Sequence, residues 1–410
     1  MNEIRIVDGD VDLRGLVREL VRVDRDGGRH GEVLSMYVDV DPRTFAAPAS
    51  RADAILSAID VAERDAPNGH WASAIDRLRS TFANGGPGGT ESARGLLVYA
   101  TADGEPTMVR LPWPVEPEIA FDRNVHVRQL VRSLPTSSWC VVLVNRRTAR
   151  IMLGDRDHLE QVDELHDEVD GMHAQGGWSQ TRFARHTEHQ VTAHLRRTID
   201  VVEDLRRSGV FDCLLIAAPA EVRGALRSLV PDQLHRTMRG FVDVDVEHAS
   251  VTEVATAAAE DVRAWDDDQL ERMLERLQRN AGRRERAVIG LDEVLQALAE
   301  QRIETLVVND GFSHPGLACP QGDWLATDGG VCPIHGTRLQ PCANIVELAI
   351  EHAVRQRAHV TIVDRVDPHA ELASDGAAPE RMAFQAMRLL GGISAIVRFD
   401  LGASLPTATV

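Results

Sequence analysis

The spacing of hydrophobic residues alternates between strand-like and helix-like along most of the chain. Short apolar runs with a period of two predict strands, whereas apolar residues at every third or fourth position predict helices. Glycine, proline, asparagine and aspartate separate many of these segments and indicate turns. The strands predicted in this way cover residues 33–40, 95–101, 107–111, 138–145, 148–153, 158–165, 213–217, 241–246, 305–308, 359–363 and 393–399.

Helix-like segments lie between these strands. The longest amphipathic one covers residues 181–208, with Val191 and Leu195 on its apolar face and Gly209 where a C-terminal cap is expected. Residues 251–287 are helical in pattern and highly charged, which suits a connecting helix. The remaining predicted helices cover 49–65, 70–83, 220–229, 291–301, 344–357 and 379–390. Strands alternating with helices are typical of the α/β fold class.

Two interruptions of this pattern divide the chain into three blocks. The proline-containing stretch 112–117 is typical of a linker, and the charged segment 251–287 forms a helical connector. We therefore predict an N-terminal α/β domain at 1–122, a middle α/β domain at 123–250 and a C-terminal α/β domain at 288–410. A chain of 410 residues is long enough for each of them to have its own core.

Composition and charge restrict the class of protein further. The chain is 43% hydrophobic and 26% charged, as expected of a globular protein. No apolar run approaches the roughly 20 residues of a membrane span, and the start lacks the pattern of a secretory signal. We therefore expect a cytoplasmic protein without a membrane partner. The net charge of −18 argues against binding a polyanion over the whole surface, but not against a local basic surface.

The five cysteines fall into two groups. Cys140 and Cys213 sit in apolar, strand-like runs, where buried thiols are expected. The other three lie in a segment at 313–342 that interrupts the last block and contains a histidine. An odd number of cysteines in a cytoplasmic chain favours a metal or free thiols over a disulfide framework.

The segment 313–342 resembles a zinc ribbon with one degenerate knuckle. Zinc ribbons use two knuckles of the type Cys-x2-Cys or Cys-x2-His. The second knuckle here is intact, whereas Gly322 stands where the first should have its second ligand. The alternative is a ribbon that has lost its metal and keeps only its turns. If zinc is bound, it is structural, and its predicted ligands are Cys319, Cys332, His335 and Cys342.

A polar loop before the long amphipathic helix carries the candidate catalytic residues, Gly177-Trp178-Ser179-Gln180. A purely structural interpretation is available, because glycines end strands and Ser179 could cap the helix. A functional interpretation rests on Gln180, whose amide has donors and an acceptor and can hold a water molecule. Arg182 and Arg185 follow on one face of the first helical turns, where the helix N-terminus also attracts anions.

These residues resemble the tip of the middle domain of archaeal and eukaryotic class-I release factors, and in particular the Gly-x-Ser-Gln variant of ribosome-quality-control tRNA hydrolases. The run from Gly391 to Phe399 resembles the closing strand of the release factors' third domain. The resemblance implies three consecutive α/β domains, with the zinc-ribbon-like insertion in the third. It also implies site roles: water placement by Gln180 with Ser179 and Gly177, and RNA contact by Trp178, Arg182 and Arg185.

The resemblance implies a ribosome-associated protein that hydrolyses the peptidyl-tRNA ester on stalled ribosomes or subunits. Its expected partners are the ribosome, peptidyl-tRNA and ribosomal RNA, with a translational GTPase as a further candidate. The stop-codon motif Asn-Ile-Lys-Ser is absent, because all 45 basic residues are arginine. The alternative is a non-catalytic hibernation or rescue factor of the Pelota and Balon type, bound in the A site. A small-molecule enzyme is a third class, which no specific feature supports.

Two further patterns concern the segment around the loop. Residues 176–240 contain ten arginines against seven acidic residues, as expected of a part that enters an RNA-lined site in an otherwise acidic protein. His186, His189 and His194 lie on the long helix without the Glu-x-x-His context of a metal pair. We expect all three to be solvated polar residues of the helix.

Overall fold

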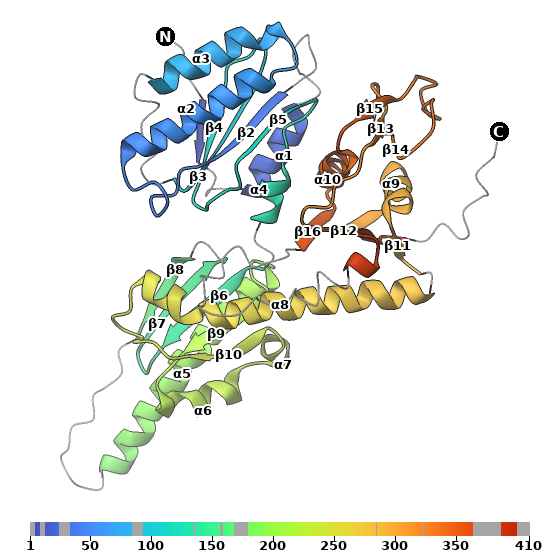
Figure 1. Cartoon of the computed structure of the whole chain (residues 1–410). Coiled ribbons are helices and arrows are strands. Elements are labelled where there is room, and N and C mark those ends of the chain that lie inside the picture. Colours follow the sequence, from blue (N-terminus) through green and yellow to red (C-terminus); the bar gives the residue numbers. More distant parts are fainter. Residues whose placement is uncertain are drawn as a thin grey trace, which may run out of the picture. The chain divides into compact units, whose positions relative to one another are not determined.

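The structure is a computed structural model that describes residues 5–8, 13–23, 33–83, 93–134, 137–155, 159–167, 179–283, 285–322, 324–363 and 387–399. The chain divides into two compact units. Unit 1 comprises residues 1–134 and 274–410, and unit 2 comprises residues 135–273. Both units are mixed α/β, with their own sheets and hydrophobic cores (Figure 1).

The N-terminal part of unit 1 is a sheet with helices on both faces. Alternate residues of its strands serve the two faces: Met36 and Val98 pack against α2 and α3, whereas Tyr37 and Leu97 belong to the core that contains α1. The order of strands is β1 (Arg5–Asp8), β4 (Thr107–Leu111), β3 (Gly95–Thr101), β2 (Val33–Asp39) and β5 (Glu118–Asp122), and the helices are α1 (Leu13–Val23), α2 (Pro48–Asp65) and α3 (Ala72–Ala83).

The predicted hairpin and the two helices after the first strand are confirmed. Strand β5, directly after the predicted linker, and the first strand and helix, β1 and α1, were not predicted. β5 is an edge strand whose side chains are all half-buried, so its hydrophobic pattern is weak. The strand is defined by its antiparallel pairing with β2 and not by its local hydrophobic pattern.

The C-terminal part of unit 1 is built on the sheet β11–β17–β12–β16, in which β12 and β16 are parallel. A small antiparallel sheet, β14–β13–β15, forms within the predicted insertion. The predicted helix 379–390 lies largely outside the described residues. The elements are β11 (Ala287–Ile289), α9 (Leu291–Ala299), β12 (Ile303–Asn309), β13 (Gly316–Ala318), β14 (Leu325–Ala326), β15 (Gln340–Cys342), α10 (Ile345–Arg355), β16 (His359–Val363) and β17 (Ile393–Val397).

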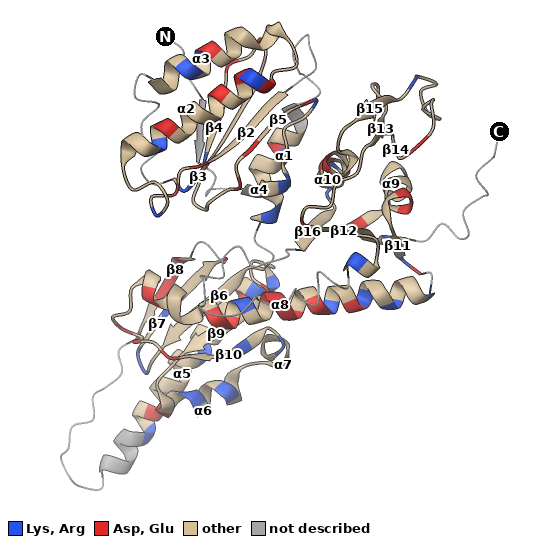
Figure 2. Ribbon diagram, in the orientation of Figure 1, with Lys and Arg blue, Asp and Glu red and all other residues tan. Residues whose placement is uncertain are grey.

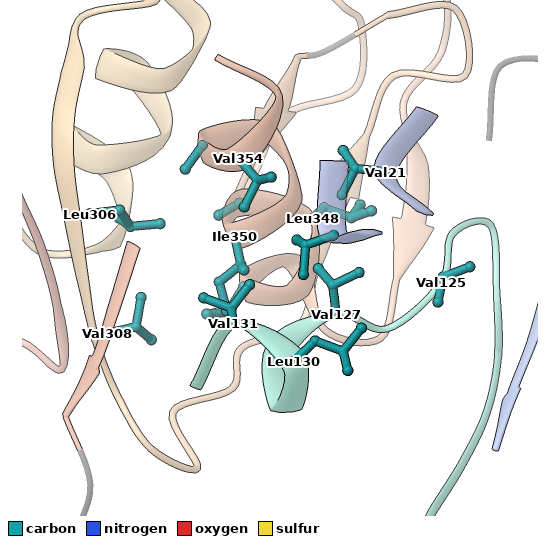
Figure 3. Packing of buried hydrophobic residues seen from close by; sticks show 14 of the residues in the cluster. Val21, Val125, Val127, Leu130, Val131, Leu306, Val308, Leu348, Ile350 and Val354 are labelled. Atoms are coloured by element: carbon teal, nitrogen blue, oxygen red, sulfur yellow. The ribbon is translucent and has the colours of Figure 1, made fainter. Parts of the chain in front are cut away.

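The two parts of unit 1 share one hydrophobic core. Val21 of α1 and Leu130 of α4 (Arg128–Arg132) pack with Leu348 and Val354 of α10 in a single cluster of buried residues (Figure 3). Segment 123–134, which follows β5, contributes several residues to this core. Physically, therefore, the first and last thirds of the chain form one body, and the boundaries at 122, 250 and 287 stay a prediction.

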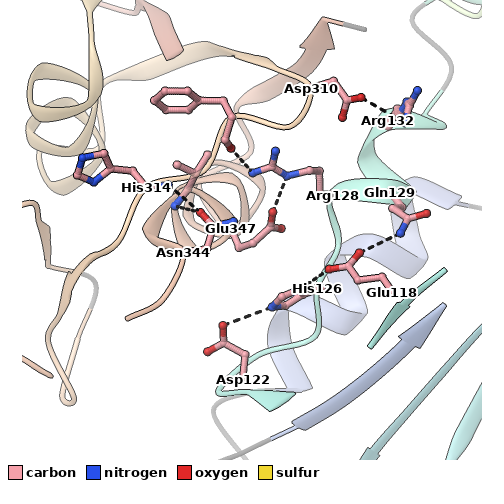
Figure 4. A network of polar contacts seen from close by, with 12 residues as sticks. Glu118, Asp122, His126, Arg128, Gln129, Arg132, Asp310, His314, Asn344 and Glu347 are labelled. Carbon is pink, nitrogen blue, oxygen red and sulfur yellow. Dashed lines mark hydrogen bonds and ion pairs between the residues drawn. The ribbon is translucent and has the colours of Figure 1, made fainter. Parts of the chain in front are cut away.

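A buried polar network reinforces this shared core (Figure 4). Arg128 donates from Nε to Glu347 Oε1 of α10 at 2.5 Å and from Nη2 to the carbonyl of Phe312 at 2.9 Å. Asn124 donates to Glu351 one helical turn further along α10. Burial raises the pKa of Glu347, and the charge of Arg128 offsets only part of that effect. The polar side chains therefore tie segment 123–134 to α10.

His126 lies at the centre of the same network. Its Nδ1 is 2.7 Å from Glu118 Oε1 and its Nε2 is 3.3 Å from Asp122 Oδ2. Burial alone would lower the pKa of His126, but the hydrogen bonds to Asp122 and Glu118 and the charge of Glu347 outweigh it and raise the pKa to about 10. At neutral pH the imidazole is therefore a cation held between two carboxylates. Its backbone carbonyl also accepts from the buried Tyr37 hydroxyl at 2.6 Å.

Unit 2 is a second mixed sheet covered on both faces. Cys140 and Val142 of β6 pack against α5 and α6, whereas Trp139 and Val141 pack against the start of α8. Strands β10, β9 and β6 are parallel, and β7 and β8 continue the sheet antiparallel. The elements are β6 (Trp139–Val144), β7 (Thr148–Gly154), β8 (Leu159–His166), α5 (Ser179–Arg207), β9 (Cys213–Ala217), α6 (Ala220–Leu229), α7 (Asp232–His235), β10 (Met238–Val242) and the part of α8 (Val251–Arg283) up to residue 273.

Three sequence-based expectations can be checked in unit 2. Cys140 and Cys213 are fully buried as predicted, and burial raises the pKa of both thiols. The charged segment predicted to be helical is α8, with basic and acidic residues along its length (Figure 2). The strand predicted at 241–246 ends earlier, at Val242. Its alternation of valine and aspartate was misleading, because Asp245 accepts hydrogen bonds from the backbone N–H groups of the next residues and forms a turn.

Candidate functional site

Helix α5 determines where the candidate catalytic residues stand. The helix begins at Ser179, two residues before the predicted start at 181. Gln180 therefore lies in its first turn. Gly177 and Trp178 lie outside the described residues, as do the side chains of Ser179, Gln180 and Arg182. Arg185 is exposed. The first N–H groups of an α-helix have no partner within the helix, so this end offers hydrogen-bond donors and partial positive charge.

The two halves of α5 have different surroundings. The C-terminal half is buried along one stripe, where Leu195, Ile199 and Val202 pack into the core of unit 2. In the stretch 185–190 Thr187 alone is buried, and most neighbouring side chains are exposed. Figure 1 shows this end of α5 extending past the sheet of unit 2. The helix ends as predicted near Gly209, whose φ of +69° is the left-handed conformation that glycine adopts readily.

A polar cluster lies on α5 where these two halves meet. His194 is completely buried, and its Nδ1 is 2.6 Å from Oδ2 of Asp167, the residue directly after β8. Arg197, one turn further along the helix, reaches Asp167 Oδ1 at 2.5 Å. The hydrogen bond with His194 lowers the pKa of Asp167, and Arg197 adds to this effect against partial burial.

The expectation that three helix histidines are solvated is therefore correct for two of them. His186 and His189 are exposed, whereas His194 is buried and paired with a carboxylate. His194 lies one position before Leu195 on the apolar stripe of the helix, so its burial follows from the helical period. The sequence does not reveal its partner, because Asp167 lies 27 residues away and meets it only when the helix packs on the sheet.

In the predicted ribbon, three of the four proposed metal ligands converge. The ligand atoms of Cys319, Cys332 and His335 all lie within 4.8 Å of one another. His335 Nδ1 is 3.5 Å from each of the two sulfurs. Bonds of ~2.3 Å to sulfur and ~2.0 Å to nitrogen at tetrahedral angles place sulfur and nitrogen about 3.5 Å apart. The donor set and its spacing therefore fit a tetrahedral metal ion, and this cluster could bind one.

The fourth predicted ligand, Cys342, is not brought into this group. It ends β15, opposite Gly316. Burial raises the pKa of Cys342, and the charge of Asp122 adds to that effect, which places the thiol near a carboxylate of β5. Nearer to the three converged ligands is the hydroxyl of Thr337, 3.5 Å from the sulfur of Cys319.

The geometry also explains the degenerate first knuckle. A Cβ atom at Gly322 would lie 2.4 Å from Cε1 of His335, closer than such atoms can approach. The imidazole therefore occupies the room that a ligand at position 322 would need. Burial alone would raise the pKa of Cys319, but hydrogen bonds from Thr337 and the backbone N–H of Gln321, with further bonds, lower it to about 7.

One basic feature of unit 2 was not singled out from the sequence. Arg223 and Arg227 stand four residues apart on α6, and their guanidinium carbons lie 5.1 and 5.2 Å from the centre of the Phe241 ring. The i, i+4 spacing puts both arginines on one helix face. Only the packing of α6 beside β10 reveals the aromatic ring between them.

No helix of the described residues has the length and apolar character required for a membrane span.

One protein family matches the middle of the chain. Residues 126–263 match the family described as bacterial archaeo-eukaryotic release factor family 10. No curated protein matches the chain.

Among solved structures, the chain is similar to an archaeal translation termination factor, aRF1, at 15% identity over 94% of this chain and 98% of that chain, with a TM-score of 0.27. It is similar to Pelota of Archaeoglobus fulgidus at 15% identity over 75% of this chain and 80% of that chain, with a TM-score of 0.32. It is also similar to Dom34 of S. cerevisiae at 10% identity over 75% and 81%, with a TM-score of 0.35.

The matched family segment contains β6 to β10, the whole of α5 and the Gly177–Gln180 motif that suggested the relationship. The relationship predicted from the sequence is thereby confirmed. Residues 126–263 are therefore what the chain has in common with the bacterial archaeo-eukaryotic release factors.

Proposed function

We propose that this protein acts on the ribosome and hydrolyses the peptidyl-tRNA ester. The observation that supports this most is the position of Gln180 in the first turn of a helix whose N-terminal end extends past the sheet of unit 2 (Figure 1). From His194 to Gln180 the helix advances by about 21 Å, at ~1.5 Å per residue. A domain that carries its motif on such a projection is suited to reach into a narrow site on a larger partner.

In the proposed reaction, the amide of Gln180 and the free backbone N–H groups at the start of α5 position a water molecule against the ester carbonyl. The same donors stabilise the negative charge that develops on the carbonyl oxygen. Gly177 and Ser179 shape the backbone around the glutamine, and Trp178 contacts a nucleotide base. Arg182 and Arg185 contact phosphates of the RNA. A side-chain base is not required when the ribosome and the tRNA supply the surrounding groups.

Peptide release from ribosomes that carry labelled peptidyl-tRNA tests this proposal. Gln180→Ala should slow release by about 100-fold or more, since removing one group that stabilises the transition state commonly has that effect. Its affinity for ribosomes should stay within about twofold of the native value. Gln190→Ala is the matched control, because it removes an amide from the same helix below the tip and should leave release unchanged.

Ribosome affinity should depend on the arginines rather than on Gln180. Arg182→Ala and Arg185→Ala should each weaken binding and reduce the slope of log affinity against log salt by about one. If the native protein binds ribosomes but releases no peptide under any condition, hydrolysis is excluded. A non-catalytic hibernation or rescue role in the A site, with a translational GTPase as a possible second partner, then replaces it.

We further propose that the ribbon binds a zinc ion through Cys319, Cys332 and His335. The distances between the ligand atoms support this assignment. Metal analysis of the purified protein should give about one zinc per chain. Cys332→Ser should remove it, whereas Cys342→Ser should retain it, because Cys342 lies outside the converged group. Loss of zinc in Cys342→Ser would instead restore Cys342 as the fourth ligand.

A further inference from the structure

The polar cluster of Asp167, His194 and Arg197 joins a buried side chain of unit 2 to its surface: His194 is fully buried, whereas the side chain of Arg197 is 56% exposed. Asp167 directly follows β8, and its backbone N–H donates to the carbonyl of Arg147, in the turn between β6 and β7, at 2.8 Å. Both oxygens of its carboxylate are directed to α5, one to His194 and one to Arg197. A single aspartate thereby joins the end of β8 to two successive turns of the long helix.

His194 contributes in an unusual way for a buried side chain. Its Nδ1 is bonded to Asp167, but its Nε2 is buried without a hydrogen-bond partner among the described residues. A buried polar atom without a partner generally destabilises a fold by about 1–3 kcal/mol. An apolar residue would suit this position on the stripe of α5 better, since Leu195 and Ile199 beside it are packed among apolar groups. Stability alone therefore does not account for a histidine here.

The position of the cluster along α5 suggests what it does. Between Arg185 and His194, Thr187 is buried and Val191 packs against the core of unit 2, whereas most other side chains are exposed. The cluster is the outermost ion-paired attachment of the helix among the described residues. Beyond it, about 21 Å of helix act as a lever. A tilt of about 5° at the cluster would displace the first turn by about 2 Å over that length. Displacements of about 1 Å at a reacting centre can lower a rate by about 100-fold.

We propose that Asp167, His194 and Arg197 form a clamp that sets the direction of helix α5 and thereby positions Gln180. The clamp residues are positioning residues, about 21 Å from the proposed chemistry, and they touch neither ester nor water. The apolar stripe holds the C-terminal half of the helix on the sheet, and the charged hydrogen bonds of the clamp define its angle. Hydrogen bonds to a charged group are directional and stronger than those between neutral groups. Apolar packing, in contrast, is not directional. This inference deepens the proposed function and depends on it for its effect on peptide release, though not for its effect on the helix.

The direction of the helix can be measured without any ribosome. Spin labels attached through a ketone-bearing unnatural amino acid at Glu188 and Ser228, both exposed positions of unit 2, report the distance from the N-terminal half of α5 to α6. The native protein should give one narrow distance distribution. His194→Leu keeps the packing volume but removes the donor. It should broaden or shift that distribution by about 1 Å, because Glu188 lies about 9 Å along the helix from His194 and a tilt of about 5° moves it by roughly that much.

Two variants serve as matched controls for this measurement. His194→Asn places an amide donor near the position of Nδ1 and should restore most of the native distribution. Arg196→Ala removes a neighbouring exposed arginine that makes no bond to Asp167 and should leave the distribution unchanged, whereas Arg197→Ala should broaden it. An unchanged distribution in His194→Leu, with folding intact by circular dichroism, would overturn the clamp whatever the ribosomal activity.

The second readout is peptide release at saturating protein. His194→Leu should lower the maximal release rate by about tenfold or more while leaving ribosome affinity within about twofold, and His194→Asn should recover the rate. A structural defect alone would instead lower the fraction of active protein and be matched by a loss of folding. If the native protein releases no peptide, the proposed reaction fails, and the spin-label distances still decide whether the clamp exists. A broadened distance distribution in His194→Leu together with an undiminished rate of peptide release would exclude the positioning role.

Discussion

Two histidine–carboxylate clusters support the two units, and they are built differently. In unit 1, His126 has both ring nitrogens bonded to carboxylates, and its pKa is raised to about 10. In unit 2, His194 has one nitrogen bonded to Asp167 and the other buried without a partner among the described residues. The first histidine is a cation at neutral pH within a network, whereas the second makes a single directed contact.

The difference shows how the number of partners determines the role of a buried histidine. A buried charge stabilises a fold only when every neighbour compensates it, as Glu118, Asp122 and Glu347 do around His126. Such a network holds two segments distant in sequence as one body. A buried histidine with only one bonded ring nitrogen, such as His194, should add little to the free energy of unfolding. We propose that it acts on the direction of helix α5 instead. We therefore expect the two clusters to respond oppositely to substitution.

The largest effect is expected from Arg128→Ala in unit 1. It leaves Glu347 buried without its partner, and breaking one side of a buried ion pair commonly lowers the free energy of unfolding by about 3–5 kcal/mol. Urea denaturation followed by circular dichroism measures this loss. Arg128→Met combined with Glu347→Leu should recover most of it, because both charges are then absent. Arg64→Ala, at an exposed position of α2, is the control and should change little.

The second-largest effect is expected from the titration of His126, which should make the free energy of unfolding depend on pH. Because its pKa is higher in the folded protein than the ordinary value of 6.5, the contribution of His126 is fully present below pH 6.5 and is lost as the pH rises through about 10. The loss over that window should be on the order of 3 kcal/mol. Unfolding titrations at pH 6 and pH 9.5 measure it, and in His126→Gln the difference between the two values should shrink. Equal slopes for both proteins would contradict the assignment.

The smallest effect on stability is expected at His194. His194→Leu removes the hydrogen bond to Asp167 but also the buried nitrogen without a partner, and these two changes act in opposite directions. The free energy of unfolding should therefore change by less than about 1 kcal/mol, and Asp167 keeps Arg197 as a partner. The same urea denaturation measures this. A loss comparable to that of Arg128→Ala would show that His194 acts in stability and not in direction.

Much of the fold could be predicted because it follows from local periodicity. The alternating strands of both central sheets, the amphipathic stripe of α5 and the helical connector depend on residues within a few positions of one another. The same holds for the ribbon, where short spacings bring Cys319, Cys332 and His335 together. Where local signals misled, as with the valine–aspartate alternation before Asp245, a side chain bonded to its own backbone and formed a turn.

What the sequence by itself determined is the class of most segments, three converging ribbon ligands and the motif that resembles the release factors. Only the tertiary structure decided that the first and last thirds share one core, that His194 is buried, and that Cys342 stays apart from the ribbon ligands. Each of these depends on contacts between residues far apart in the chain, such as Arg128 with Glu347 or Asp167 with His194. Such contacts leave no periodic trace in the sequence, because their partners are chosen by the packing of whole elements.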